Sequence, residues 1–206
     1  MSDKIDLDYV KQAGRSYESY QDLIDGLLAQ GKTTGTDQGI HRLKHAPLNR
    51  QRIKRLDKTA RLHPEFTALL RQIPYKPGFL VLTEGWCGDA AQMLPYIHLM
   101  ALATKEVADE YYLLRDVHPD LMNRFLSNGA RAIPKLVVFN ARDGQILFTW
   151  GPRPESIQTW YLDMKKSGQY TKEEGNRMLH QRYTSDKGKS FQDDLTVLFR
   201  NSFLPH

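Results

Sequence analysis

The sequence predicts an α/β fold, because short buried strands alternate with amphipathic helices along its central part. One observation is the apolar run at residues 79–82, preceded by Pro77-Gly78, since a short bounded run suits a strand covered on both faces. Another is the helical spacing of apolar residues from Ala90 to about residue 108. A third is the Asp143-Gly144 turn signal between two apolar runs, which is typical of a hairpin. Together they predict a central sheet with helices on both faces.

Composition and charge limit the functional classes. The chain has 206 residues, of which 40% are hydrophobic and 26% charged, as in an ordinary globular protein. The formal net charge of +5 indicates no more than a weak preference for anionic partners. No apolar run approaches the roughly 20 residues of a membrane span, and residues 1–6 lack the apolar core of a signal peptide. We therefore expect a cytoplasmic protein without a membrane partner.

Four segments precede the central sheet. Residues 1–14 are polar and predict a loosely held lead-in. Residues 16–30 have an amphipathic repeat and predict a helix. Residues 40–62 favour a second helix with a break or bend at Pro47. Residues 63–72 predict a short third helix before the first strand.

Alternating elements follow the first strand and its helix. Residues 110–115 predict a strand, and residues 120–127 a helix. Residues 132–140 and 145–150 predict the two strands of the hairpin. Residues 155–166 then predict a helix with one apolar face.

The end of the chain predicts two more helices, at residues 171–184 and 190–203. The first starts with Thr171-x-x-Glu174, which resembles a capping box. The predicted organisation is an N-terminal helical extension packed on the core, a central region and a C-terminal helical extension, at residues 1–75, 76–166 and 167–206.

The second half of the segment at residues 40–62 is strongly basic, with Asp57 as its single acid. One interpretation is a helix that binds phosphate or nucleic acid. The other, which we favour, is a solvated face whose basic side chains cover the core with their aliphatic stems. No aromatic residues interleave with the charges, so a nucleic-acid partner is not expected. The basic residues are Arg50, Arg52, Lys54, Arg55, Lys58 and Arg61.

His41 and His45 stand four residues apart, as two metal ligands on one helix would. No nearby cysteine or acidic residue completes a site. We therefore interpret them as surface histidines and expect no metal.

The only cysteine, Cys87, lies where the first central strand turns into its helix. Unpaired backbone N–H groups and the positive end of the helix dipole stabilise a thiolate at such a position. One cysteine excludes an internal disulfide, which agrees with a reducing compartment. It also excludes a dithiol–disulfide cycle within the chain.

The segment at residues 86–90, Trp-Cys-Gly-Asp-Ala, resembles the active-site turn of the thioredoxin family, Trp-Cys-Gly-Pro-Cys. Cys87 matches the attacking cysteine of that family. Asp89 replaces the proline of the motif, and Ala90 replaces the resolving cysteine. Pro95 matches the proline that kinks the family's active-site helix.

A second segment, Arg131 to Phe139, resembles the Ile-Pro segment that enters a central strand in the same family. The resemblance implies that Pro134 is cis and packs beside the cysteine. It covers residues 76–166 and implies a thioredoxin-like fold, with a central mixed sheet flanked by helices. The run at residues 84–92 is similar to a bacterial branch with an N-terminal helical extension and no resolving cysteine.

The chemistry implied by this resemblance is incomplete. Reduction of a disulfide needs a thiolate and then a second thiol. Ala90 cannot supply the second, so turnover would need an external thiol such as glutathione, or a cysteine of a partner. The buried aspartate of the family's proton relay is also missing, because Val81 stands at its position. The chain is therefore not expected to be a standard dithiol reductase.

Opposing effects act on the pKa of the Cys87 thiol. The helix N-terminus, with the backbone N–H groups of Asp89 and Ala90, lowers it. Arg131, which the resemblance places nearby, would lower it further. The Asp89 carboxylate raises it.

Two functions stay open at this point, and an enzymatic role is undecided. One is a monothiol thiol–disulfide redox protein in which Cys87 is catalytic and forms mixed disulfides with protein or small-molecule partners. It would hold no cofactor and would use glutathione or another thiol as co-substrate. The other is a non-catalytic binding module that recognises a peptide or thiol ligand beside Pro134. The expected binding residues are Trp86, Gly88, Asp89, Ala90, Arg131, Ile133 and Pro134.

Overall fold

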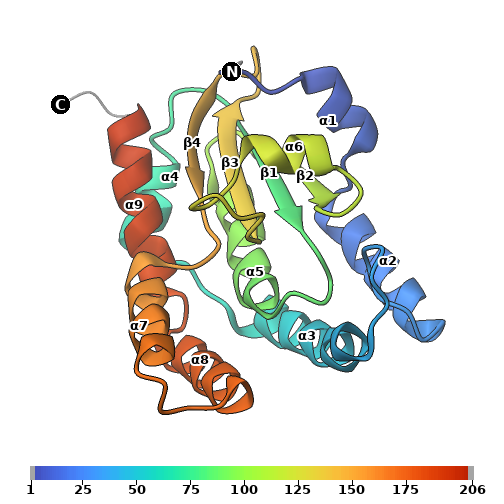
Figure 1. The fold of residues 1–206 in the computed structure, drawn as a ribbon. Helices are drawn as coiled ribbons and strands as arrows, with labels where there is room; N and C mark the ends of the chain where they lie inside the picture. Colours follow the sequence, from blue (N-terminus) through green and yellow to red (C-terminus); the bar gives the residue numbers. More distant parts are fainter. Residues whose placement is uncertain (1–2, 204–206) are drawn as a thin grey trace.

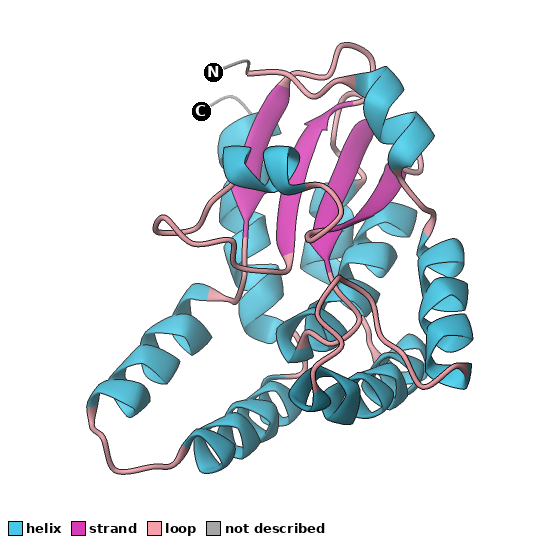
Figure 2. Ribbon diagram, turned by 45° about the vertical axis from the view of Figure 1, so that its right-hand side comes forward, coloured by secondary structure: helices cyan, strands magenta, loops and turns pink. Residues whose placement is uncertain are grey.

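The computed structural model describes residues 3–203, which form a four-stranded sheet flanked by helices (Figures 1 and 2). The strand order is β2-β1-β3-β4; β1 is parallel to β2 and antiparallel to β3, and β4 is antiparallel to β3. The predicted α/β fold with a mixed sheet is therefore confirmed. The strands are β1 (Pro77–Thr83), β2 (Asp109–Leu114), β3 (Lys135–Asn140) and β4 (Ile146–Trp150).

Helices cover both faces of the sheet. In Figure 1, α6 lies in front of the strands and α5 behind them, while α3 and α8 lie beyond the lower end of the sheet. The capping box predicted for α8 is present, with Thr171 and Glu174 each bonded to the other's backbone. The helices are α1 (Leu7–Ala13), α2 (Tyr17–Ala29), α3 (Ile40–Thr59), α4 (Pro64–Leu70), α5 (Gly88–Ala103), α6 (Pro119–Arg124), α7 (Glu155–Lys166), α8 (Lys172–Asp186) and α9 (Lys189–Phe203).

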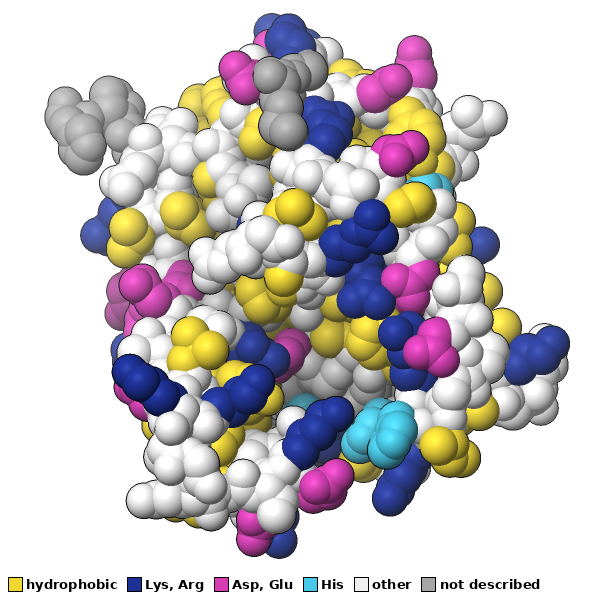
Figure 3. Space-filling view, in the orientation of Figure 1, with side chains coloured by type: hydrophobic (Ala, Val, Ile, Leu, Met, Phe, Trp, Pro, Cys, Tyr) yellow, Lys and Arg dark blue, Asp and Glu magenta, His cyan; other side chains and the backbone are white. Residues whose placement is uncertain are grey.

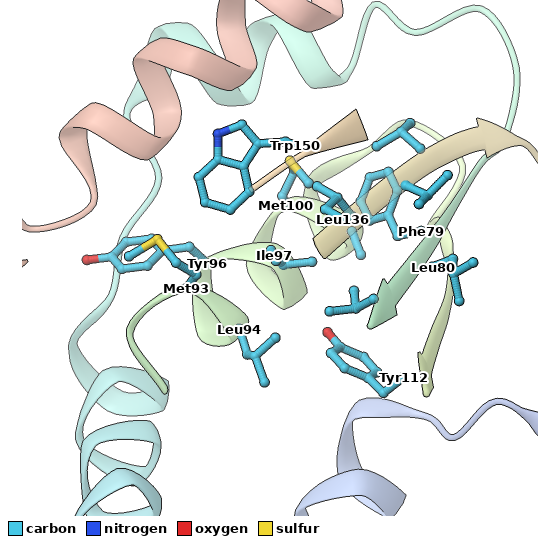
Figure 4. Close-up of a cluster of buried hydrophobic side chains, with 14 of the residues drawn as sticks. Phe79, Leu80, Met93, Leu94, Tyr96, Ile97, Met100, Tyr112, Leu136 and Trp150 are labelled. Carbon is cyan, nitrogen blue, oxygen red and sulfur yellow. The ribbon is translucent and has the colours of Figure 1, made fainter. Parts of the chain in front are cut away.

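The core lies between α5 and the sheet (Figure 4). All seven residues of β1 are buried, and α5 is buried around most of its circumference because α3 packs on the side away from the strands. The turn at Cys87 joins these two elements, so it is held at both ends by packed structure. Labelled core residues in Figure 4 are Phe79, Leu80, Met93, Leu94, Tyr96, Ile97, Met100, Tyr112, Leu136 and Trp150.

The N-terminal segment is ordered, so the prediction of a loosely held lead-in is wrong for residues 3–14; residues 1–2 lie outside the described range. Ile5 and Val10 are buried in the core. Asp6 caps α1 by accepting a hydrogen bond from the Tyr9 N–H group at 3.0 Å. Two well-placed apolar side chains and a cap dock a segment whose average composition is polar.

Two predicted features of the helices also need correction, the break at Pro47 and the end of the helix that follows Cys87. Pro47 lies inside α3, which continues from Ile40 to Thr59 without a break. One missing N–H group is tolerated there, since buried residues such as Ile53 hold the helix on the core. Helix α5 ends at Ala103 and not near residue 108, because the Thr104 hydroxyl bonds the backbone of the following turn. No helix within residues 3–203 is long and apolar enough to cross a membrane.

Candidate functional site

Cys87 is the N-cap residue of α5, as its position between strand and helix predicts. Its sulfur accepts a hydrogen bond from the Ala90 N–H group at 3.4 Å, and its S–H group donates to the Ile133 carbonyl at 3.3 Å. The Ile133–Pro134 peptide bond is cis, as predicted. The Cys87 residue is only 7% exposed. The thiol is therefore hydrogen-bonded on both sides and nearly closed off from solvent.

Burial decides the protonation of this thiol. Burial and the nearby Asp89 carboxylate raise the pKa of Cys87 to about 12, although the N–H groups of Ala90 and Asp89 and the Arg153 guanidinium act in the opposite direction. The sequence predicts opposing effects on this pKa, and burial together with the Asp89 carboxylate outweighs the effect of the helix N-terminus. Cys87 is a protonated thiol at neutral pH.

Asp89 holds the C-terminal part of the chain against the turn. Its carboxylate forms a two-point ion pair with Arg153, at 2.9 Å from Nε and 2.6 Å from Nη2. It also accepts a hydrogen bond from the Tyr183 hydroxyl of α8 at 2.7 Å. The Asp89 residue is buried, and burial raises the pKa of its carboxyl group while Arg153 and Tyr183 act to lower it. The residue that replaces the proline of the thioredoxin motif is thus the anchor of α8.

Helix α8 covers the turn at Gly88. A Cβ atom at this position would lie 3.0 Å from Cε1 and Nε2 of His180, so the close approach of α8 requires a residue without a side chain. The His180 ring bonds the Gln92 amide of α5 at 3.2 Å. Burial, followed by the positive charges of Arg52 and its neighbours, lowers the pKa of His180 to about 4. The imidazole is neutral at neutral pH.

An open cleft of about 1170 Å³ separates α3 from α8, and Trp86, Gly88 and Asp89 lie at its base. We call it the basic cleft. In Figure 3 a hollow in the lower part of the molecule is bordered by basic side chains and histidine. Its charged and histidine lining residues are His41, Arg42, Lys44, His45, Arg52, Arg55, Asp89, Arg153, Lys172, Glu173, Arg177 and His180.

Most of the cations in the basic cleft have no acidic partner. Arg42 pairs with Asp37 and Asp116, and Arg153 pairs with Asp89. The remaining five form no ion pair with any residue in the part of the chain that the structure describes: Lys44, Arg52, Arg55, Lys172 and Arg177. The cleft therefore presents an excess of positive charge from both helices, against one acid that is unpaired among the described residues, Glu173.

The comparisons with known proteins agree with this geometry. A family model described as Thioredoxin, Thioredoxin_9, matches residues 40–173. The chain belongs to this thioredoxin family. The matched range includes α3, the Cys87 turn and the first two residues of α8, whereas the remaining α8 residues that line the basic cleft lie beyond it.

Two solved structures resemble this thioredoxin-family protein. An HIV epitope scaffold is 15% identical with a TM-score of 0.55, and the match covers 91% of this chain and 99% of the scaffold. A protein of unknown function from Pseudomonas aeruginosa is 17% identical with a TM-score of 0.47, over 81% of this chain and 96% of that one. The first likeness concerns the fold alone. No curated protein matches the chain.

The structure divides the predicted site residues into two sets. Trp86, Gly88 and Asp89 line the basic cleft. Ala90, Ile133 and Pro134 are buried beside Cys87 and do not line that cleft. Within residues 3–203, no group of three or more His, Cys, Asp or Glu side chains is arranged to hold a metal ion.

Arg131, expected beside the thiol, instead donates to the Asn123 side chain at 2.8 Å and is exposed. The guanidinium that acts on Cys87 belongs to Arg153. Sequence reasoning missed Arg153, His180 and Tyr183, because their contacts with the turn join residues far apart in the chain. The only local signal was the substitution of proline by Asp89 in the motif.

The basic residues of α3 fall into two groups, and the interpretation that the helix binds phosphate or nucleic acid stays a prediction. Arg50 is buried and pairs with Asp25 at 2.8 Å, as a core-covering residue would. Arg52 and Arg55 line the basic cleft. His41 and His45 are exposed, as predicted, and lie at the edge of the same cleft.

Proposed function

We propose that this protein is a non-catalytic binding module of the thioredoxin family and that the basic cleft is its ligand site. One observation carries the proposal: the Cys87 thiol points inward, to the Ile133 carbonyl, whereas Trp86, Gly88 and the ion-paired Asp89 line the cleft. The proposed ligand site lies where the family has its active site. The groups that a ligand can reach there are the charged side chains of the basic cleft and not the thiol.

A catalytic role requires a thiolate that can reach a disulfide. Burial raises the pKa of Cys87 to about 12, so the thiol is protonated at neutral pH. The sulfur is also buried beneath the elements that Asp89 anchors. Both properties support binding over thiol–disulfide exchange.

The second candidate is a monothiol redox protein, and one observation favours it. The Cys87 sulfur accepts the Ala90 N–H group at the start of α5, so a thiolate formed there would be stabilised. This function would require α8 to move away from the turn and an external thiol such as glutathione to resolve the mixed disulfide. The reducing cytoplasm would be its proposed location.

One experiment separates these two functions. The native protein is incubated with glutathione disulfide at neutral pH, and its intact mass is measured. The binding module predicts no adduct, whereas the same treatment in denaturant modifies Cys87. The Cys87→Ser variant serves as the unreactive control. An adduct on the native protein at a rate comparable to that of a free thiol would contradict the proposal and support the monothiol function.

A further inference from the structure

The uncompensated cations of the basic cleft allow its ligand class to be inferred, on the premise that the cleft is the binding site proposed above. We propose that the basic cleft binds a small polyanion with two or more phosphate groups. The inference depends on where the cations lie, on their lack of acidic partners among the described residues, and on the other groups that line the cleft.

The cations face one another across the cleft. After burial, the charges of Arg52 and Lys44 on α3, and of Lys172 on α8, lower the pKa of the exposed ring of His45. Two helices thus direct positive charge to the same space. The cleft is lined by seven Lys and Arg side chains and by only two acids, Asp89 and Glu173. This excess of like charge raises the electrostatic potential of a concave surface, and an anion entering it would relieve the repulsion.

The positive groups extend from the edge of the cleft to its base. Lys44 and Lys172, with the ring of His45, lie at the edge. Arg52 and Arg153 act on His180 near the base, where Gly88 and Asp89 lie. A single monovalent anion would leave most of these charges uncompensated. A ligand with two or more anionic groups can reach both ends.

The chemistry of the donors favours phosphate over carboxylate. The free cations of the cleft are three arginines and two lysines, and guanidinium groups present several N–H donors to one tetrahedral anion. The side-chain amide of Asn176 also lines the cleft, whereas those of Asn49 and Gln92 are engaged with Gly85 and His180. Charge-assisted hydrogen bonds of this kind to phosphate oxygens are among the strongest in proteins.

The cleft suits a small ligand better than a nucleic acid. Its volume of about 1170 Å³ is close to the range of small-molecule sites. Trp86 is the only aromatic residue besides the histidines that lines it, and two guanidinium groups already lie over that ring, Arg42 at 4.1 Å and Arg115 at 4.7 Å from its centroid. A stacking surface for successive bases is therefore not offered.

The test is a calorimetric titration of the full chain with inorganic tripolyphosphate, compared with orthophosphate, citrate and a single-stranded oligonucleotide. We expect tripolyphosphate to bind most tightly, with an affinity that falls as salt rises. Arg177→Glu, on the exposed face of α8, should weaken binding by more than tenfold, because it replaces an attraction by a repulsion. Arg52→Ala on α3 should weaken it by about tenfold.

Lys58→Ala is the matched control, since Lys58 is an exposed cation of α3 that does not line the cleft. It should change the affinity by less than about twofold. Absence of tripolyphosphate binding, equal binding by Arg177→Glu, or tighter binding of citrate or the oligonucleotide would each overturn the inference. If tripolyphosphate fails to bind while Cys87 stays unreactive, the ligand class is wrong and the binding module stands. If tripolyphosphate binds and Cys87 forms the adduct, the non-catalytic assignment fails and the ligand class stands.

Discussion

Cys87 and Asp89 stand two residues apart on one turn and are both buried, but they contact different partners. Cys87 points into the core, donates its proton to a carbonyl and is neutral. Asp89 reaches the base of the basic cleft and binds Arg153 and Tyr183. The difference shows that a turn can keep its place in the thioredoxin fold while its side chains make contacts that the family motif does not indicate. The contacts of each side chain, and not the motif, therefore decide which of them lines the proposed ligand site.

The largest test of this contrast is Asp89→Ala. The substitution leaves the guanidinium of Arg153 without its carboxylate and removes the acceptor of Tyr183. We expect a loss of about 3 kcal/mol in the free energy of unfolding, measured with urea, because an unpaired charge would remain in a mostly buried site. Cys87 should also become reactive toward thiol reagents. Asp193→Ala, which breaks an exposed pair with Lys189, is the control and should have little effect.

The next test uses pH and His180. Its pKa in the folded protein, about 4, lies below the ordinary value of 6.5. The neutral ring therefore contributes stability above pH 6.5, and this stability is lost as pH falls toward 4. The difference corresponds to about 3 kcal/mol. His180→Gln should have a shallower decline of unfolding free energy over this range. Parallel curves for the two proteins would show that His180 is not held neutral.

Gly88→Ala tests the closeness of α8 to the turn. The added Cβ would meet the His180 ring at 3.0 Å, so this ring must move by a few tenths of an ångström and strain its hydrogen bond to Gln92. We expect a loss of about 1 kcal/mol in thermal or urea unfolding. Gly26→Ala in α2, where a Cβ would meet nothing within 4 Å, should instead stabilise the protein. Destabilisation of equal size in both variants would argue against a specific contact at Gly88.

Cys87→Ser should have the smallest effect. The serine hydroxyl can keep the hydrogen bond to Ile133, so the free energy of unfolding should fall by about 1 kcal/mol or less. Tripolyphosphate affinity should not change, because the thiol does not line the basic cleft. Calorimetry of the variant beside the native protein measures this. A large loss of affinity would mean that the thiol side and the cleft side of the turn act together.

The fold was largely predictable, because its signals are local. Patterns among neighbouring residues predict the strand before Cys87, the hairpin at Asp143-Gly144 and the helix at residues 155–166. The cis bond at Pro134 followed from a family resemblance and not from any pattern in the chain. The N-terminal segment was misjudged, since two isolated apolar residues dock it while its composition remains polar.

The site was less predictable, because its contacts are long-range. Asp89 could be recognised as a departure from the family motif, yet its partners Arg153 and Tyr183 lie 64 and 94 residues away. Likewise, basic residues on α3 gained meaning only when α8 brought Lys172 and Arg177 opposite them. The sequence shows which residues of a helix are basic, but it does not show which surface of the folded protein they share with another helix.

Trp86 lines the basic cleft, so its intrinsic fluorescence can report binding there. An indole that lies at the base of the cleft under the guanidinium groups of Arg42 and Arg115 has an emission that depends on the local field. The other two tryptophans lie elsewhere: Trp150 is buried against Asp194, and Trp160 lies against Arg182. A bound anion should therefore shift the fluorescence of one residue out of three, and Trp86→Phe should abolish that shift. Candidate ligands can therefore be screened by intrinsic tryptophan fluorescence, without an added label.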